Sequence, residues 1–307
     1  MELRHLRYFI AVAETGSLTV AAEQRLHTAQ PSLSRQIRDL EAEVGVALLT
    51  RSVRGVELTA AGRAFVDHAR LALSQVEAAG VAARRAAQTA KPSFALGFLT
   101  GQEMNWLPEA MHVLRDELPN LEVKVSSDYS PLLAEGLMRG RLDLAFMRPE
   151  PDMPDLAYEV VMREPLLLVL PSAHRLASRK AVGIRDIAGE TFIGMSKTAP
   201  SLRGVIDAYL SRVGVAIRVA HEADNLAMAI SLVASTGGVS LLPDYARDFL
   251  PRAVVSRALK GETPTIALVI GYHKGNGSPV LKMFLERSEG LMARVANRLR
   301  SNANSGG

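Results

Sequence analysis

Apolar residues in the first forty positions recur at intervals of three and four, and this helical spacing is interrupted twice. The first run covers residues 3–13 and stops shortly before Ser17, whose hydroxyl suits the cap of a second helix. The second run ends at Leu26, and a third opens on Gln30-Pro31, where proline is tolerated because the first helical N–H has no partner. The pattern predicts a helix-turn-helix, a motif that reads DNA.

The third predicted helix has two different faces. Leu33, Ile37 and Leu40 form its apolar stripe. Gln and Arg side chains make paired hydrogen bonds to base edges, and Ser and Arg reach phosphates, so the opposite face is typical of a helix in the major groove. An ordinary solvated helix is the alternative. The candidate DNA-binding residues of this face are Gln30, Pro31, Ser32, Ser34, Arg35 and Arg38.

The segments on either side of Ser52-Val53 predict a wing and then a long helix. Residues 48–51 and 55–58 are typical of two short strands, and Arg51 and Arg54 of this wing are expected along the phosphates or in the minor groove. A heptad seam follows, which indicates a coiled-coil dimer, although a helix packed on its own domain remains the alternative. The seam consists of Phe65, Ala69, Ala72, Val76, Ala79, Ala83 and Ala86.

The pattern changes after Lys91-Pro92, where proline ends the helix. Short apolar runs then alternate with amphipathic helices, which predicts an α/β arrangement of two lobes, with the chain crossing between them twice. Ligands of open α/β sheets bind beyond the carboxyl ends of strands, where helix N-termini offer free N–H groups. Three such junctions suit a carboxylate: Thr100-Gly101-Gln102, Ser130 before Pro131, and Ser196-Lys197-Thr198. A helix cap explains Ser130 equally well.

Composition narrows the function classes. The chain has no cysteine, so disulfides and thiolate metal sites are excluded. The start lacks a signal segment, and no apolar run approaches the roughly 20 residues of a membrane helix, so we expect a cytoplasmic protein. The net charge is +4, with most of the excess within residues 1–92. Enzyme motifs and metal-ligand histidine spacings are missing from the sequence, and we therefore predict no enzyme, no cofactor and no metal.

Three segments resemble the LysR-type transcriptional regulators, and the resemblance covers essentially the whole chain. They are Met-Glu-Leu-Arg-His-Leu-Arg-Tyr-Phe at 1–9, Ala-Gln-Pro-Ser-Leu-Ser-Arg-Gln-Ile at 29–37 and Leu-Thr-Ala-Ala-Gly at 58–62. Within the family the chain is most similar to activators that respond to aromatic acids or their ring-cleavage products, of the phenylpropionate-catabolism type.

This resemblance implies an α+β protein in three parts. The last part resembles type 2 periplasmic binding proteins, and crossings near Glu164 and Ile270 match that organisation. The expected parts are a winged helix-turn-helix at 1–58, a linker and dimerisation helix at 59–91, and an effector-binding domain at 92–307, with lobe 1 at about 92–164 plus 270–307 and lobe 2 at about 165–269.

The resemblance also implies partners and further site residues. Promoter DNA, a small aromatic or unsaturated carboxylate, a second copy of the chain in a dimer that pairs into a tetramer, and RNA polymerase for an activator are the expected partners. Phe146 and Arg148 are expected at a strand end facing the cleft, where Arg148 binds the anion or a neighbouring acid. Asn225 is a candidate from the second lobe, and Met195 supplies apolar wall or core.

Two positions depart from the family pattern. Three residues separate Ala22 from Leu26 where relatives usually have two, so one residue must be absorbed in the turn. Relatives that sense aromatic acids often carry serine at the position of Gly101, so Thr100 or backbone N–H groups have to replace it.

The rival hypothesis is an α/β solute-binding or catalytic protein whose N-terminal helices serve assembly only.

Overall fold

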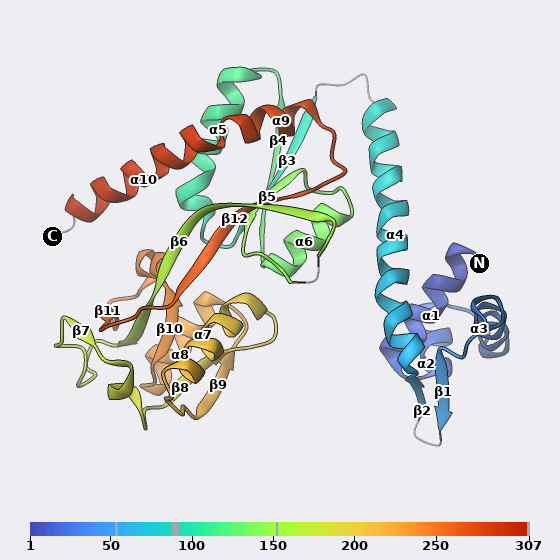
Figure 1. The fold of residues 1–307 in the computed structure, drawn as a ribbon, viewed down its shortest axis with the longest axis horizontal. Helices are drawn as coiled ribbons and strands as arrows, with labels where there is room; N and C mark the ends of the chain where they lie inside the picture. Colours follow the sequence, from blue (N-terminus) through green and yellow to red (C-terminus); the bar gives the residue numbers. More distant parts are fainter. Residues whose placement is uncertain (53–54, 88–91, 152, 306–307) are drawn as a thin grey trace. The chain divides into compact units, whose positions relative to one another are not determined.

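The computed structural model describes residues 1–52, 55–87, 92–151 and 153–305 (Figure 1). The chain separates into two compact units, Met1–Gln88 and Thr89–Gly307. Lys91, where the sequence predicts the end of the long helix, lies outside the described residues. None of the described helices is long and apolar enough to cross a membrane.

The first unit is a helical core with a two-stranded wing and a long helix. Phe9, Leu33 and Ile37 are fully buried at its centre, as the apolar spacing predicts. The two strands pair in antiparallel fashion, with Leu49 opposite Leu58. The elements are α1 (Leu3–Thr15), α2 (Leu18–Val20), η1 (Ala21–Arg25), α3 (Gln30–Val44), β1 (Leu49–Ser52), β2 (Gly55–Leu58) and α4 (Ala60–Ala87).

The extra residue after Ala22 is absorbed in η1, which is a π-helical turn. Here the N–H of Leu26 donates to the carbonyl of Ala21, five residues back, at 3.0 Å. The chain then turns at His27, whose φ of 48° lies in the left-handed region. The widened turn takes up the insertion locally, and α3 still begins at Gln30, where the sequence places it.

The long helix α4 is covered over its first turns only. The rings of Phe65 and Phe9 meet edge to face with centroids 5.3 Å apart, and Ala69 is buried. Farther along the predicted seam Ala72 and Ala79 are exposed, and Val76 is 42% exposed. The start of the helix therefore packs on its own unit, while the later seam positions lie at the surface of the single chain.

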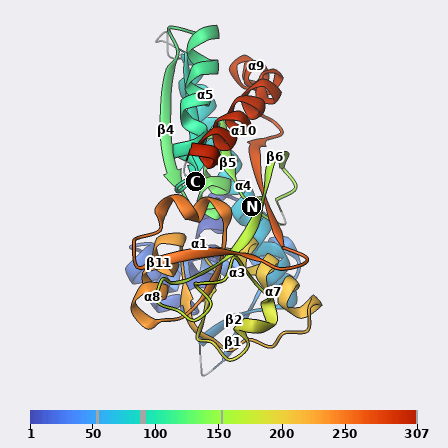
Figure 2. The same ribbon diagram turned by 90° about the vertical axis from the view of Figure 1, so that its left-hand side faces the viewer.

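The second unit has two lobes joined by two long strands. Figure 2 shows α5 and α10 crossing in the first lobe, with α7 and α8 in the second. The first lobe contains β3 (Ser93–Leu99), α5 (Glu103–Glu117), β4 (Glu122–Asp128), α6 (Ser130–Met138), β5 (Leu144–Met147), α9 (Pro279–Glu286) and α10 (Ser288–Ser305). The second contains β7 (Ala181–Val182), η2 (Ile184–Ile187), β8 (Phe192–Met195), α7 (Pro200–Arg212), β9 (Val219–Ala223), α8 (Leu226–Thr236), β10 (Ser240–Pro243), η3 (Asp244–Phe249) and β11 (Val254–Leu259).

The two long strands are β6 (Leu156–Pro171) and β12 (Thr265–His273). The strand order of their sheet is β4-β3-β5-β12-β6-β11-β7, and β10 also pairs with β6. β6 leaves β12 near Glu164, as predicted, and continues beside β10 and β11. The expected second crossing at Ile270 is wrong, because Ile270 pairs with Phe146 inside the first lobe, and the lobes part near Thr265 instead.

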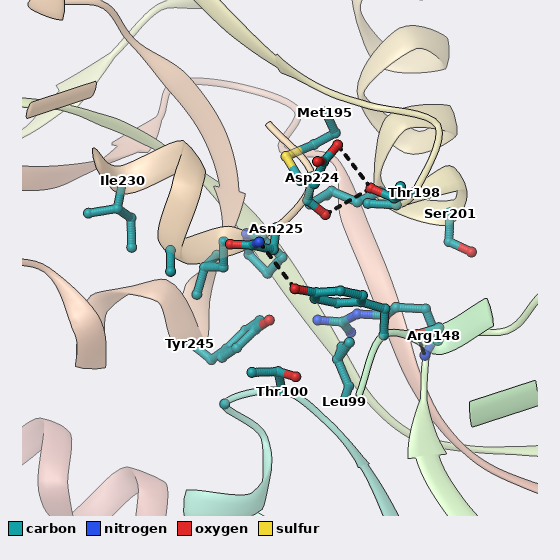
Figure 3. A pocket seen from close by; sticks show the side chains of 18 of the residues that line it. Leu99, Thr100, Arg148, Met195, Thr198, Ser201, Asp224, Asn225, Ile230 and Tyr245 are labelled. Atoms are coloured by element: carbon teal, nitrogen blue, oxygen red, sulfur yellow. Dashed lines mark hydrogen bonds between the residues drawn. The ribbon is translucent and has the colours of Figure 1, made fainter. Parts of the chain in front are cut away.

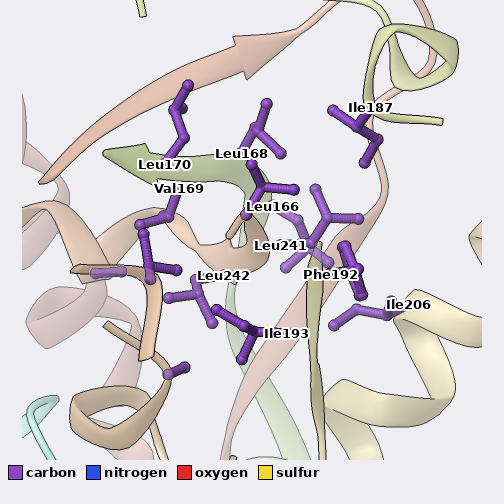
Figure 4. Close-up of a cluster of buried hydrophobic side chains, with 14 of the residues drawn as sticks. Leu166, Leu168, Val169, Leu170, Ile187, Phe192, Ile193, Ile206, Leu241 and Leu242 are labelled. Atoms are coloured by element: carbon purple, nitrogen blue, oxygen red, sulfur yellow. The ribbon is translucent and has the colours of Figure 1, made fainter. Parts of the chain in front are cut away.

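Each lobe has its own core. In the second lobe Leu166 and Leu168 from β6 pack with Phe192 from β8 and Ile206 from α7 (Figure 4). In the first lobe the core is aromatic and gathers Phe98, Trp106, Phe146 and Phe284. Because the two cores are separate, the lobes contact each other through the strands that join them and through residues that lie between them.

Candidate functional sites

A cavity of about 650 Å³ lies between the two lobes. Figure 3 shows Tyr245 and Asn225 from the second lobe facing Thr100 and Arg148 from the first. The lining comes from the carboxyl ends of β3 and β5, the start of α6, the β8–α7 junction, the start of α8, and η3. Predicted site residues that line the cavity are Thr100, Gly101, Ser130, Arg148, Met195, Thr198 and Asn225.

Three predicted effector residues do not line the cavity. The Gln102 amide is buried behind it and donates to the Glu164 carboxylate at 3.3 and 3.2 Å. The Ser196 hydroxyl donates to Asp224 at 2.6 Å. The expected cleft position of Phe146 is wrong. Its ring stacks on Phe98 with centroids 5.2 Å apart, because α5 and α9 cover that face of β5.

Arg148 forms a buried ion pair at the floor of the cavity. Its Nη2 lies 2.5 Å from Oε2 of Glu164, and the two side chains are only 5% and 3% exposed. The guanidinium carbon also lies 5.8 Å from the ring centroid of Tyr245, within cation–π range. Among the described residues nothing accepts from the buried Nη1. The acid partner that the sequence left open is therefore Glu164.

Hydroxyl and amide groups supply further polar lining beside Arg148. The Ser130 hydroxyl accepts from the backbone N–H of Arg148 at 2.9 Å instead of capping its own helix. Asn225 caps α8 through Met228 and also donates to the Tyr129 hydroxyl of the other lobe at 3.2 Å. The oxygens of Ser130 and Tyr129 act as acceptors in these bonds, so their O–H groups remain to donate to a ligand.

The aromatic residues of η3 explain the glycine at position 101. Gly101 has a φ of +93°, and a Cβ added there would lie 3.0 Å from Tyr245 and 3.1 Å from Phe249. The two rings reach from the second lobe to the β3–α5 junction, so a side chain at this position is strained in its backbone and has to displace the rings by a few tenths of an ångström. Neither ring is among the residues predicted from the sequence. The feature that indicates them is their position directly after the apolar run at 239–243, at the carboxyl end of a strand.

Glu150 is a further cavity residue that was not predicted from the sequence. Its side chain lines the cavity, the residue is 8% exposed, and the buried Oε1 has no hydrogen-bond partner among the described residues. Burial raises the pKa of Glu150 to about 7.

The polar face of α3 matches the prediction with one exception. Ser34 is wrong as an exposed residue, because it lies one turn before Ile37 and next to Leu33, at the edge of the apolar stripe, and is 8% exposed. Arg54 and the side chain of Arg51 lie outside the described residues. The remaining residues reach the surface: Gln30, Pro31, Ser32, Arg35 and Arg38.

The bacterial regulatory helix-turn-helix model of the lysR family matches residues 3–63, and the LysR substrate binding domain model matches residues 87–292. The chain belongs to the LysR family of transcriptional regulators. This confirms the resemblance seen in the sequence, and it places the helix-turn-helix of this LysR-family chain in its first unit and the effector-binding domain in its second.

Individual LysR relatives are similar over nearly the whole chain. The Hca operon transcriptional activator HcaR of Escherichia coli is 37% identical over 96% of this chain and 99% of its own length. AlsR of Bacillus subtilis is 34% identical over 96% of this chain and 98% of its own. Full-length BenM has 29% identity and a TM-score of 0.58, covering 96% and 97%. CbnR bound to its target DNA has 27% identity and a TM-score of 0.56, covering 95% and 100%.

Proposed function

We propose that this LysR-family regulator binds a small aromatic or unsaturated carboxylate between its lobes and thereby controls how it holds promoter DNA. The observation that carries the proposal is the composition of the cavity. Arg148, Ser130 and Tyr129 line the cavity together, and their guanidinium and hydroxyl groups are donors of the kind that a carboxylate accepts from. Apolar side chains supply the wall on which a ring or conjugated chain packs: Leu99, Met195, Leu226, Ile230 and Phe249.

Thermal unfolding of the full-length protein tests the effector. We expect one or more acids among benzoate, phenylpropionate, cinnamate and muconate to raise the transition temperature, because a ligand that binds only the folded state stabilises it. Ser130→Ala is expected to abolish the shift, while Ser235→Ala, whose hydroxyl bonds only within its own helix, keeps it. If every acid leaves the transition unchanged, the carboxylate proposal is wrong and the family assignment stands.

We also propose that α3 reads promoter DNA through Gln30, Ser32, Arg35 and Arg38. Arg35→Ala is expected to weaken DNA binding by about 1–3 kcal/mol, since one side chain that contacts bases or phosphates is lost. The transition temperature is expected to stay the same, because Arg35 is exposed. The matched control is Arg115→Ala on α5 in the second unit. Unchanged DNA affinity in Arg35→Ala, measured by fluorescence anisotropy, contradicts this reading surface.

The proposal includes a second copy of the chain. The exposed seam positions of α4, among them Val76, are offered as a dimer surface, and two such dimers form the expected tetramer. A dimer presents two α3 helices to successive major grooves. Binding of an acid between the lobes then shifts their relative orientation, and with it the spacing of the reading helices. RNA polymerase is the further partner if the protein activates transcription.

A further inference from the structure

Two aromatic side chains of η3 line the cavity, and one of them is largely uncovered. Tyr245 is partly buried, whereas Phe249 is 37% exposed. An exposed apolar side chain on the convex surface of a protein is ordinary, but Phe249 belongs to the lining of a concave site. Its ring is therefore apolar surface that a bound ligand can cover.

The position of the Phe249 ring is supported by its neighbours. The rings of Phe249 and Tyr245 meet edge to face, with centroids 6.2 Å apart and planes inclined at 85°. Tyr245 in turn packs against the guanidinium of Arg148, whose carbon lies 5.8 Å from the ring centroid. Arg148 is held by its ion pair with Glu164. The aromatic pair of η3 therefore rests on a buried, charged anchor in the other lobe.

The outer ends of the two rings point at the first lobe. A Cβ added to Gly101 would lie 3.0 Å from Cε2 of Tyr245, and 3.1 and 3.2 Å from Cζ and Cε2 of Phe249. These atoms lie at or near the end of each ring that is remote from its own backbone. The rings approach this closely because glycine has no side chain. The contact with the first lobe uses the ends of the rings and leaves the face of Phe249 for another partner.

A hydroxyl donor lies next to this aromatic pair. Thr100 directly precedes Gly101, lines the cavity, and lies close to Tyr245 (Figure 3). The Thr100 hydroxyl accepts from Ser127 at 3.2 Å, so its own O–H remains to donate to a carboxylate. An acid that binds Thr100 through its carboxylate therefore has the rings of η3 within reach of its apolar end.

The other apolar residues of the wall are aliphatic, and they attract an apolar group according to the area that is buried. They do not distinguish a phenyl ring from a cyclohexyl ring. Aromatic rings gain additional energy from stacked and edge-to-face contacts with one another. Among the described residues, the lining contains three aromatic rings. Tyr245 already packs against Arg148, and the Tyr129 hydroxyl is bonded to Asn225, so Phe249 is the ring best able to distinguish ligands.

We propose that Phe249, supported by Tyr245 beside Gly101, packs against the ring of the effector and selects aromatic carboxylates over saturated or open-chain acids of similar size. The inference rests on the proposed function, since it concerns the same cavity and the same ligand. It decides between the aromatic and the open-chain acids that the proposed function leaves together. No covalent bond changes, because the contact is one of packing alone.

Isothermal titration calorimetry of the full-length protein tests the proposal with two matched pairs of acids. They are 3-phenylpropionate with 3-cyclohexylpropionate, and benzoate with cyclohexanecarboxylate; sorbate is the open-chain acid. Burial alone does not favour the phenyl member, because the saturated ring has the same number of carbon atoms and is at least as apolar. We expect the aromatic acid of a pair to bind about two- to tenfold more tightly than its saturated partner, and sorbate to bind more weakly than the aromatic acid.

Two variants identify the residue responsible. Phe249→Leu keeps an apolar side chain without a ring, so it is expected to bind the two members of each pair with equal affinity. Leu226→Ala removes apolar area from the aliphatic wall, so it is expected to weaken both members by the same factor and to keep the preference. The wild-type comparison needs no substitution and does not depend on how either variant folds.

Each outcome has a definite meaning. Equal binding of a matched pair by the wild type, a preference that survives Phe249→Leu, or tighter binding of sorbate than of the aromatic acids overturns this inference alone. A preference that Leu226→Ala abolishes as completely as Phe249→Leu does also overturns it, because the selection then belongs to the wall as a whole. If the wild type binds none of these acids, the proposed function is overturned and this inference with it.

Discussion

Replacing Arg148 with methionine is expected to lower the free energy of unfolding by about 3–5 kcal/mol, because the Glu164 carboxylate then remains buried without a counter-charge. The two side chains are 5% and 3% exposed, and their ion pair is 2.5 Å long. Among the described residues, the Gln102 amide is then left to hydrogen-bond the carboxylate. Urea unfolding monitors the change through Trp106, the single tryptophan of the chain, which is buried in the same lobe.

Two further variants separate this effect from the loss of any arginine. Arg148→Met combined with Glu164→Gln removes the stranded charge and is expected to recover much of the lost stability. Arg203→Met breaks an ion pair with Glu222 whose side chains are 36% and 51% exposed, and it is expected to cost less than about 1 kcal/mol. If Arg148→Met costs no more than Arg203→Met, the buried pair does not have the role assigned to it.

The wild-type protein is expected to lose about 3 kcal/mol of stability, relative to Glu150→Gln, as the pH rises from 4.5 to above 7. The pKa of Glu150 rises from 4.5 in the unfolded chain to about 7 in the folded one. Between these values the folded state holds a proton that the unfolded state has released, so stability falls as the pH increases. Below this range both states are protonated, and above it both are ionised, so the difference is constant at either end.

Urea midpoints of the two proteins at closely spaced pH values between 4.5 and 8 measure this dependence. The comparison of slopes matters more than the absolute stabilities, because the glutamine amide has its own cost of burial. Glu135→Gln removes an exposed carboxyl of α6 and serves as control. A difference between wild type and Glu150→Gln that does not change with pH contradicts the assignment of a buried, protonated carboxyl.

Short-range patterns in the sequence were sufficient to predict much of the fold and part of the cavity lining. The spacing of Leu33, Ile37 and Leu40, together with Pro31, placed helix α3, because a helix with one apolar stripe has only one way to face a core. The hydroxyl and glycine junctions at Thr100 and Ser130 placed the first-lobe side of the cavity, because ligands gather where strands end and helices begin. The three quoted family segments gave the family itself.

Positions at the boundary between two faces or two lobes were not predicted correctly. Ser34 lies at the edge of the apolar stripe and is buried, and Phe146 turned out to face helices and not the cleft. Both faces of β5 are covered in the folded lobe, so alternation along that strand does not tell a cavity from a core. The crossing assigned to Ile270 moved to Thr265, because the register of β12 against β6 is set by pairing and not by composition.

The sequence alone predicted most of the helices and strands, the helix that carries the proposed DNA-reading residues, and the junctions that line the cavity in the first lobe. Only the tertiary structure decided that the insertion after Ala22 becomes a π turn, that Tyr245 and Phe249 lie against Gly101, and that the acid paired with Arg148 is Glu164. Local patterns depend on residues a few positions apart. The shape of the cavity depends on residues about a hundred positions apart, such as Tyr129 and Asn225, which meet only when both lobes have folded.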